Sequence, residues 1–293
     1  MQPTSLLVLV STLWLAQPVM AKDDFRPMLF AAEGAKKIIR YGADGQVAWE
    51  FPAEMSRDVW ALPNSNVLFC FNQDYDSRRH DNPSGVMEVR PDKTIVFAFW
   101  TTGQVWSCQR MADGNTLVGA ASQGKLLVVS PEARVIKSVQ LRNTAGHSCL
   151  RNARQIANGH VLVAEESAHA AREYNPDGRI VREIKVSFAP YSVVRLENGN
   201  TVICGQKTII EVDPADKIVW SIKGDDLPEL GIRWFAGLQI LPNANRFVCN
   251  AGGKVPFLEI SPDKRVVWQS PSVMTISLGH GIQRLDVAGP PRK

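Results

Sequence analysis

Five side chains at similar intervals along the sequence are of types that recognise planar or anionic ligands: Arg57, Trp106, Arg151, Tyr191 and His280. The first four follow one another at intervals of 49, 45 and 40 residues, and Ala236 takes the next equivalent position. Arginine binds carboxylate, sulfate or phosphate through paired hydrogen bonds, and aromatic rings stack on planar groups. If the fold brings these positions to one cavity, they predict a site for a small anionic or aromatic ligand.

Other polar and aromatic residues lie close to these positions in the sequence. The nearby candidates are Asp58, His147, Asn152, Trp234 and the acidic pair Glu165 and Glu166, which could balance the arginines. The long polar segment 71–85 carries Arg78, Arg79 and His80. We expect this segment to lie at the same rim, either as a lid over the site or as a solvated surface loop.

Strands joined by tight turns would hold these residues. The phrase RLENGNTVIC (195–204) recurs as ALPNSNVLFC (61–70), RMADGNTLVG (110–119), QIANGHVLVA (155–164) and ILPNANRFVC (240–249). Each copy joins two strand-like runs through a turn rich in Asn and Gly, which are residues that tolerate positive φ angles. The phrase therefore predicts a recurring β-hairpin.

A second phrase lies between the copies of the first. It occurs six times, for example as EYNPDGRIVREI (173–184) and EISPDKRVVWQS (259–270), and again consists of strand, turn and strand. A repeat of roughly 40–50 residues that contains two hairpins is typical of a β-propeller with four strands per blade.

The two ends of the chain indicate how many blades there are. HGIQRLDV (280–287) matches the start of the first phrase but lacks its partner strand, and RPMLFAAEG (26–34) reads like that partner. Pairing the two segments in one blade would close the ring and remove its open edges. We therefore predict an all-β, six-bladed propeller that forms one domain over residues 22–293.

Residues 1–21 form a predicted signal peptide. They contain an apolar run of about a dozen residues, and Val19-Met20-Ala21 supplies the small residues that cleavage requires. The alternative is an uncleaved apolar start. The run is too short to cross a bilayer, so we expect an exported protein, periplasmic or extracellular, with no membrane span after cleavage.

The composition excludes some classes of partner. The chain has 293 residues, 45% hydrophobic and 21% charged, with a net charge of +4, which is ordinary for a globular domain. No basic run with interleaved aromatic residues occurs, so the sequence gives no support for nucleic-acid binding.

The five cysteines do not form a metal-binding pattern. Cys70, Cys204 and Cys249 recur at one place in three repeats and are predicted to be small buried hydrophobic residues. Cys108 and Cys149 are the one pair for which we consider a disulfide, and the sequence leaves that question open. No Cys or His spacing suggests zinc, and Asp58 and Asn152 alone do not complete a calcium site, so we predict neither metal nor cofactor.

One register of the second phrase is predicted to be structural. Four residues after the turn position, four blades carry Trp49, Phe97, Trp220 and Trp268, and the other two carry Lys137 and Arg182. An aromatic residue at a fixed register of a repeat favours packing between blades over ligand binding.

The phrases LPNSNVLF, ADGNTLVG and PDGRIVREI resemble the repeats of exported bacterial propellers of the arylsulfotransferase type and of related quinoprotein-like and NHL-type proteins. The resemblance extends over nearly all of residues 26–287. It implies sulfate transfer through a channel histidine, for which His280 is the matching residue, with His147 and Arg151 as helpers. The His-Asp pairs and the additional N-terminal domain of that family are absent from this sequence.

Three functions stay open at this point. The sequence favours a non-enzymatic exported propeller that binds a small molecule, glycan or protein at the channel mouth, because the catalytic set is incomplete. The second hypothesis is an arylsulfotransferase-like transferase or a hydrolase that uses His280 as nucleophile or general base. The third is an interaction scaffold without channel chemistry.

Overall fold

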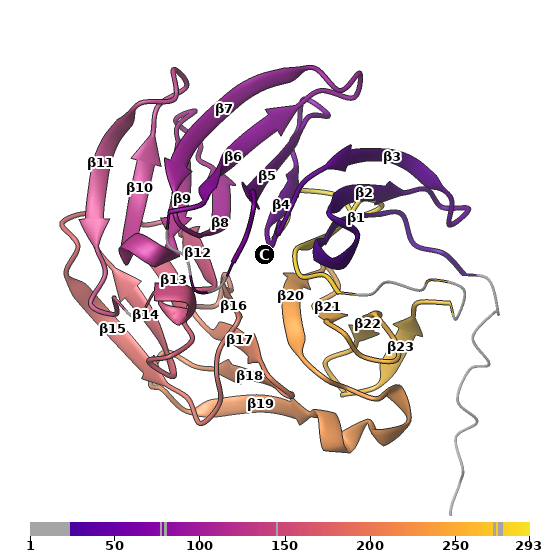
Figure 1. The fold of residues 1–293 in the computed structure, drawn as a ribbon. Helices are drawn as coiled ribbons and strands as arrows, with labels where there is room; N and C mark the ends of the chain where they lie inside the picture. Colours follow the sequence, from indigo (N-terminus) through magenta and orange to yellow (C-terminus); the bar gives the residue numbers. More distant parts are fainter. Residues whose placement is uncertain (1–23, 77, 79–80, 145, 272–273, 275–277) are drawn as a thin grey trace, which may run out of the picture.

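The computed structural model describes residues 24–76, 78, 81–144, 146–271, 274 and 278–293. Its strands form six four-stranded antiparallel sheets arranged in a ring around a central channel (Figure 1). The predicted all-β, six-bladed propeller is confirmed. We name the blades A to F in ring order and give the strands of each blade from the channel outward.

The first three blades contain the N-terminal half of the propeller. Blade A consists of β24 (Ile282–Arg284), β1 (Met28–Ala32), β2 (Lys37–Tyr41) and β3 (Val47–Pro52). Blade B consists of β4 (Val59–Ala61), β5 (Val67–Asn72), β6 (Pro83–Val89) and β7 (Ile95–Thr102). Blade C consists of β8 (Val105–Arg110), β9 (Thr116–Ala120), β10 (Lys125–Val129) and β11 (Val135–Gln140).

The other three blades complete the ring. Blade D consists of β12 (Asn152–Gln155), β13 (Val161–Glu165), β14 (Ala170–Tyr174) and β15 (Ile180–Lys185). Blade E consists of β16 (Ser192–Arg195), β17 (Thr201–Gly205), β18 (Thr208–Val212) and β19 (Ile218–Lys223). Blade F consists of β20 (Phe235–Ile240), β21 (Arg246–Asn250), β22 (Phe257–Ile260) and β23 (Val266–Gln269). Short 3-10 helices η1 to η5 occupy Glu33–Ala35, Ala121–Gln123, Gly146–Ser148, Gly224–Asp226 and Pro228–Leu230.

The two ends of the chain close the ring in blade A, as predicted. β24 pairs antiparallel with β1, with Met28 opposite Arg284 and Phe30 opposite Ile282. The innermost strand therefore comes from the C-terminal end of the chain, and its three neighbours come from the N-terminal end. This arrangement leaves every blade with four strands.

The turns of the recurring hairpin share one backbone conformation, with positive φ at the residue after the first turn position. Gly159 and Gly199 have φ angles of 80° and 86°, a region that glycine enters without steric cost. Ser65 and Ala244 hold the same place in two other copies, also at positive φ. The Asn and Gly residues of the phrase are therefore part of the scaffold.

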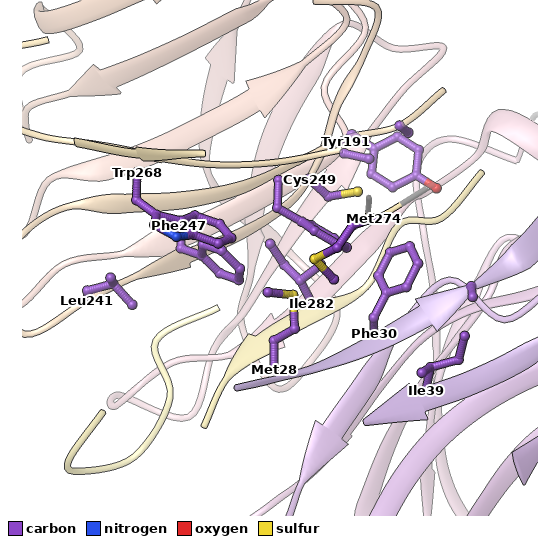
Figure 2. Packing of buried hydrophobic residues seen from close by; sticks show 14 residues of the cluster. Met28, Phe30, Ile39, Tyr191, Leu241, Phe247, Cys249, Trp268, Met274 and Ile282 are labelled. Atoms are coloured by element: carbon purple, nitrogen blue, oxygen red, sulfur yellow. The ribbon is translucent and has the colours of Figure 1, made fainter. Parts of the chain in front are cut away.

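The apolar core lies between neighbouring blades. The cluster at the junction of blades F and A is shown in Figure 2. Phe30 of β1 meets Phe257 of β22 edge to face, with ring centroids 4.8 Å apart, and Trp268 of β23 is fully buried beside them. Tyr191 belongs to the same cluster, so this packing fixes one side chain of the channel mouth.

The five cysteines are all free and buried. Cys108 and Cys149 are not bonded to each other: they lie in different core clusters, and Cys149 Sγ donates to the Asn143 carbonyl at 2.7 Å. The prediction that Cys70, Cys204 and Cys249 are small buried residues is confirmed.

The predicted signal peptide, residues 1–21, lies outside the described residues and stays a prediction. Within the described part of the chain, no helix has the length and apolar character that crossing a membrane requires.

Candidate functional site

A cavity of about 400 Å³ opens at one end of the central channel, and we call it the mouth cavity. Its lining residues are Arg57, Arg151, Glu166, Tyr191, Arg233, Trp234, Ala251, Gly252, Leu278 and His280. Six of these were among the sequence-derived candidates. Five of the six meet because each lies just before the innermost strand of its blade, and these strands begin at the same end of the channel, whereas Glu166 follows the second strand of blade D.

Arg57 is held between a carboxylate and an aromatic ring. Its Nε donates to Glu33 Oε2 at 2.7 Å and its Nη2 to Oε1 at 3.4 Å. The guanidinium lies 4.1 Å from the ring centroid of Trp106, which is a cation–π distance. Both partners of the ion pair are buried, with side chains 10% and 6% exposed.

Arg151, two blades further along the ring, has a similar environment. Its Nε donates to Glu166 Oε2 at 2.5 Å, and its side chain is 7% exposed. The guanidinium lies 5.6 Å from the Tyr191 ring and 5.9 Å from the Trp106 ring. Trp106 thus contacts both arginines, although it does not line the mouth cavity itself.

Tyr191 and His280 form a stacked aromatic pair at the mouth cavity. Their rings are stacked, with centroids 5.0 Å apart and planes 6° from parallel. Trp234 meets the Tyr191 ring edge to face at 6.3 Å. Burial raises the pKa of Tyr191, so its hydroxyl keeps its proton and can donate a hydrogen bond.

His280 lies beside Glu33, with Nδ1 3.0 Å from Oε2, although the contact is too bent for a well-aligned hydrogen bond. Burial lowers the pKa of His280 more than Glu33 raises it, and Arg57 and Arg151 lower it further. His280 is therefore neutral at pH 7. Burial would raise the pKa of Glu33, but the neighbouring His280 and Arg57 outweigh burial and lower it. Because His280 is neutral, Arg57 is the partner that keeps Glu33 ionised.

Three buried donors at the mouth cavity are not used by the rest of the described protein. They are the Tyr191 hydroxyl, Trp234 Nε1 and Arg151 Nη1, for which no hydrogen-bond partner exists among the described residues. Buried polar groups are nearly always hydrogen-bonded, so three such donors around one cavity are unusual.

His147 lies beside the mouth cavity, in a polar cluster with Tyr75 and Gln104. Its Nδ1 is 3.0 Å from the Tyr75 hydroxyl and 3.0 Å from Gln104 Oε1. Its carbonyl accepts a hydrogen bond from Trp106 Nε1 at 3.0 Å. His147 therefore helps to hold the Trp106 ring in place, and that ring contacts both arginines. His147 itself does not line the cavity.

Asp58 lies deeper, in the wall of the channel, and it is paired there. Arg154 donates to its two oxygens at 2.7 and 2.9 Å, and the Cys108 amide donates at 3.0 Å. Lys293 also lies in the channel, with Nζ 4.5 Å from the Trp60 ring centroid and its carbonyl 2.8 Å from Arg154 Nε. The cavity between these side chains has a volume of about 10 Å³, which is room for about one water molecule.

The remaining candidates lie elsewhere. Arg78 is 86% exposed and pairs with Asp76 of its own loop, while Arg79 and His80 lie outside the described residues. Glu166 pairs with Arg151 as expected, but Glu165 does not balance the mouth arginines. It is fully buried within blade D, where it accepts hydrogen bonds from Arg172 and the Tyr174 hydroxyl.

Sequence reasoning missed Glu33, Tyr75 and Arg233. A signal for Glu33 was present, because Glu33-Gly-Ala-Lys36 and Glu166-Ser-Ala-His169 hold the same repeat register in blades A and D. Both segments end in a left-handed residue whose amide bonds back to the glutamate carbonyl. Tyr75 and Arg233 lie in loops of unequal length, where the repeat gives no register.

Metal binding has no evident place here: among the described residues, no three His, Cys, Asp or Glu side chains gather in a way that could hold an ion. All the residues that line the mouth cavity are among those described.

No family model and no curated protein matches this sequence. Among solved structures, a protein of unknown function from Bacteroides caccae is similar, with 21% identity and a TM-score of 0.74 over 88% of this chain and 97% of that one. The likeness is one of fold. An inactive virginiamycin B lyase from Staphylococcus aureus with quinupristin has 10% identity and a TM-score of 0.60 over 88% of each chain.

A third similar structure is BBS1N in complex with ARL6DN, with 14% identity and a TM-score of 0.53 over 83% of this chain and 74% of that one. At such identities the comparisons support the propeller architecture alone. They do not confirm the arylsulfotransferase-type or NHL-type repeat that the sequence suggested.

Proposed function

We propose that the protein binds a small planar anion at the mouth cavity, as an exported ligand-binding propeller. The observation that carries this proposal is the convergence of three buried, unpartnered donors on one cavity: the Tyr191 hydroxyl, Trp234 Nε1 and Arg151 Nη1. A carboxylate or sulfate offers several acceptor lone pairs and would satisfy these donors together.

The charges around the cavity favour an anion. Its lining contains three arginines and one carboxylate, and Glu33 behind Arg57 leaves an excess of one positive charge while His280 is neutral. Arg57 and Arg151 are held in place by their own carboxylates and by Trp106, so they lose little freedom when a ligand binds.

The stacked Tyr191 and His280 rings favour a flat ligand body. An aromatic ring of the ligand would lie against these two rings, and the anionic group of the ligand would point toward Arg151. A cavity of about 400 Å³ is within the range of small-molecule sites. The proposed ligand class is therefore an aryl carboxylate or aryl sulfate.

Calorimetric titration with benzoate, phenyl sulfate and neutral phenol tests the proposal. The two anions should bind more tightly than phenol, and Arg151→Gln should weaken anion binding about tenfold to a hundredfold, because a hydrogen bond to a charged group is lost. The matched control is Arg90→Gln, since Arg90 is exposed on a turn outside the cavity. Equal anion affinity in wild type and Arg151→Gln would refute the proposal.

A second candidate function is catalysis by His280. The observation that supports it is the position of the Glu33 carboxylate, whose Oε2 lies 3.0 Å from His280 Nδ1, because a carboxylate beside a histidine stabilises the imidazolium that a general base becomes. An assay with an aryl sulfate donor and a phenol acceptor tests it. Turnover that His280→Ala abolishes would support catalysis, and turnover unchanged in that variant would exclude His280 from it.

A further inference from the structure

The junctions between blades repeat one interaction. The residue at the aromatic register of an outer strand reaches the turn of the next blade. Trp49 Nε1 donates to the Pro91 carbonyl at 3.0 Å, and Trp220 Nε1 donates to the Pro262 carbonyl at 2.7 Å. At the second of these junctions, Arg246 lies over the Trp220 ring at 4.1 Å. The protein thus contains its own examples of how an indole fits between two blades.

The same register is filled at three further junctions. Trp268 Nε1 donates to the Asp24 carbonyl at 2.6 Å, and Arg182 Nη2 donates to the Asp213 carbonyl at 2.6 Å. Phe97 is buried at the junction of blades B and C. Whether aromatic or guanidinium, a planar group occupies the space between the blades in all five cases.

The junction of blades C and D is different. The residue at this register is Lys137, which is exposed, whereas its five counterparts are buried or half-buried. A cavity of about 450 Å³ lies there, and we call it the junction cavity. Apolar side chains make up most of its wall, including Met111, Leu117, Leu126, Val139, Val161 and Tyr174.

The walls of the junction cavity match an indole better than they match a cation. Val161 occupies the position that Arg246 holds at the junction of blades E and F, so the floor is apolar. Pro176 occupies the position of Pro262 and lines the cavity. No donor to its carbonyl oxygen exists in the described part of the chain, whereas Pro262 receives the Trp220 N–H.

We propose that the junction cavity is a second binding site, for a small molecule with an indole-like fused ring and a ring N–H. The ring lies against Val161 in the space that Trp220 fills at the equivalent junction, and its N–H donates to the Pro176 carbonyl. The volume of about 450 Å³ is typical of a small-molecule site.

This site is independent of the mouth cavity. The two cavities share no lining residue, and none of the residues that precede the innermost strands lines the junction cavity. A failure to bind a ligand at one cavity therefore does not exclude binding at the other cavity.

Calorimetric titration of the whole mature protein with indole, and separately with 1-methylindole, tests the inference. We expect indole to bind one site with a dissociation constant on the order of a millimolar or tighter, and 1-methylindole, which has no N–H, to bind several-fold more weakly. No indole binding at about 10 mM, or equal affinity for the two compounds, would overturn the assignment.

Two variants fill the junction cavity with side chains taken from the junction of blades E and F. Lys137→Trp supplies the missing indole, and Val161→Arg supplies the counterpart of Arg246. Either variant should abolish indole binding, and Lys137→Trp should also raise Tm by several degrees. Lys185→Trp is the control, because Lys185 is exposed on the outer strand of blade D and does not line the junction cavity, so this variant should bind indole within about twofold of wild type. Undiminished binding in a folded Lys137→Trp or Val161→Arg protein would place the indole elsewhere and refute the proposal.

Discussion

Replacing Glu33 with glutamine should destabilise the protein strongly, because Glu33 is the buried counter-charge of Arg57. The two side chains are 6% and 10% exposed, and two hydrogen bonds join them. Glu33→Gln keeps the size of the side chain but removes its charge, so the guanidinium stays buried without compensation. Removing one partner of such a pair costs about 3–5 kcal/mol.

The expected change in thermal stability follows from this free energy. For a domain of this size, each kcal/mol lowers Tm by about 2–4 °C, so Glu33→Gln should lower Tm by about 10 °C at pH 7. Differential scanning calorimetry measures this shift. Glu54→Gln is the matched control, because the Glu54 carboxylate pairs with Lys36 at the surface and its removal should hardly change Tm.

The pH dependence separates lost charge from altered packing. The pKa of Glu33 is lowered in the folded protein from its ordinary value of 4.5, so the stability that its charge contributes is present above that value. This contribution is lost as the pH falls toward the folded pKa. The Tm difference between wild type and Glu33→Gln should therefore narrow between about pH 5 and about pH 3. Equal stability of the two proteins at pH 7, or a Tm difference that does not change with pH, would show that the charge of Glu33 does not stabilise the fold.

Two further predictions concern the scaffold. Gly85→Ala should lower the free energy of unfolding by about 1–3 kcal/mol in urea denaturation, because an added Cβ would lie 1.9 Å from the Phe99 carbonyl oxygen; an unchanged midpoint would contradict this packing. All five cysteine thiols are free and buried, so Ellman's reagent should react slowly with the native protein and rapidly with five thiols after unfolding in urea. A thiol that reacts at once in the native protein would contradict the structure.

The architecture could be predicted from the sequence because its signals are local and repeated. Most hairpin turns contain Asn, Asp or Gly, which tolerate positive φ, and five copies of one phrase fix the period. The pairing of β24 with β1 followed from fragments at 280–287 and 26–34 that are incomplete alone and complete together.

The grouping of site residues could be predicted only where the repeat register applies. Arg57, Arg151, Tyr191 and His280 meet because equivalent positions in different blades lie at the same end of the channel. Loop residues such as Arg233 have no register, so their position depends on tertiary packing that the pattern does not encode.

Sequence neighbours of the site residues were misleading for a simple geometric reason. Successive side chains of an extended segment point to opposite sides. Asp58 therefore turns away from the mouth cavity toward Arg154, and Glu165 turns into blade D while Glu166 reaches Arg151.

A crystal structure of the protein soaked with phenyl sulfate would show directly whether the mouth cavity binds an aryl anion. We expect ordered density in the mouth cavity, with the ring against Tyr191 and His280 and the sulfate within hydrogen-bond distance of Arg151 Nη1 and the Tyr191 hydroxyl. An empty mouth cavity at a saturating ligand concentration, or density only at another site, would contradict this expectation.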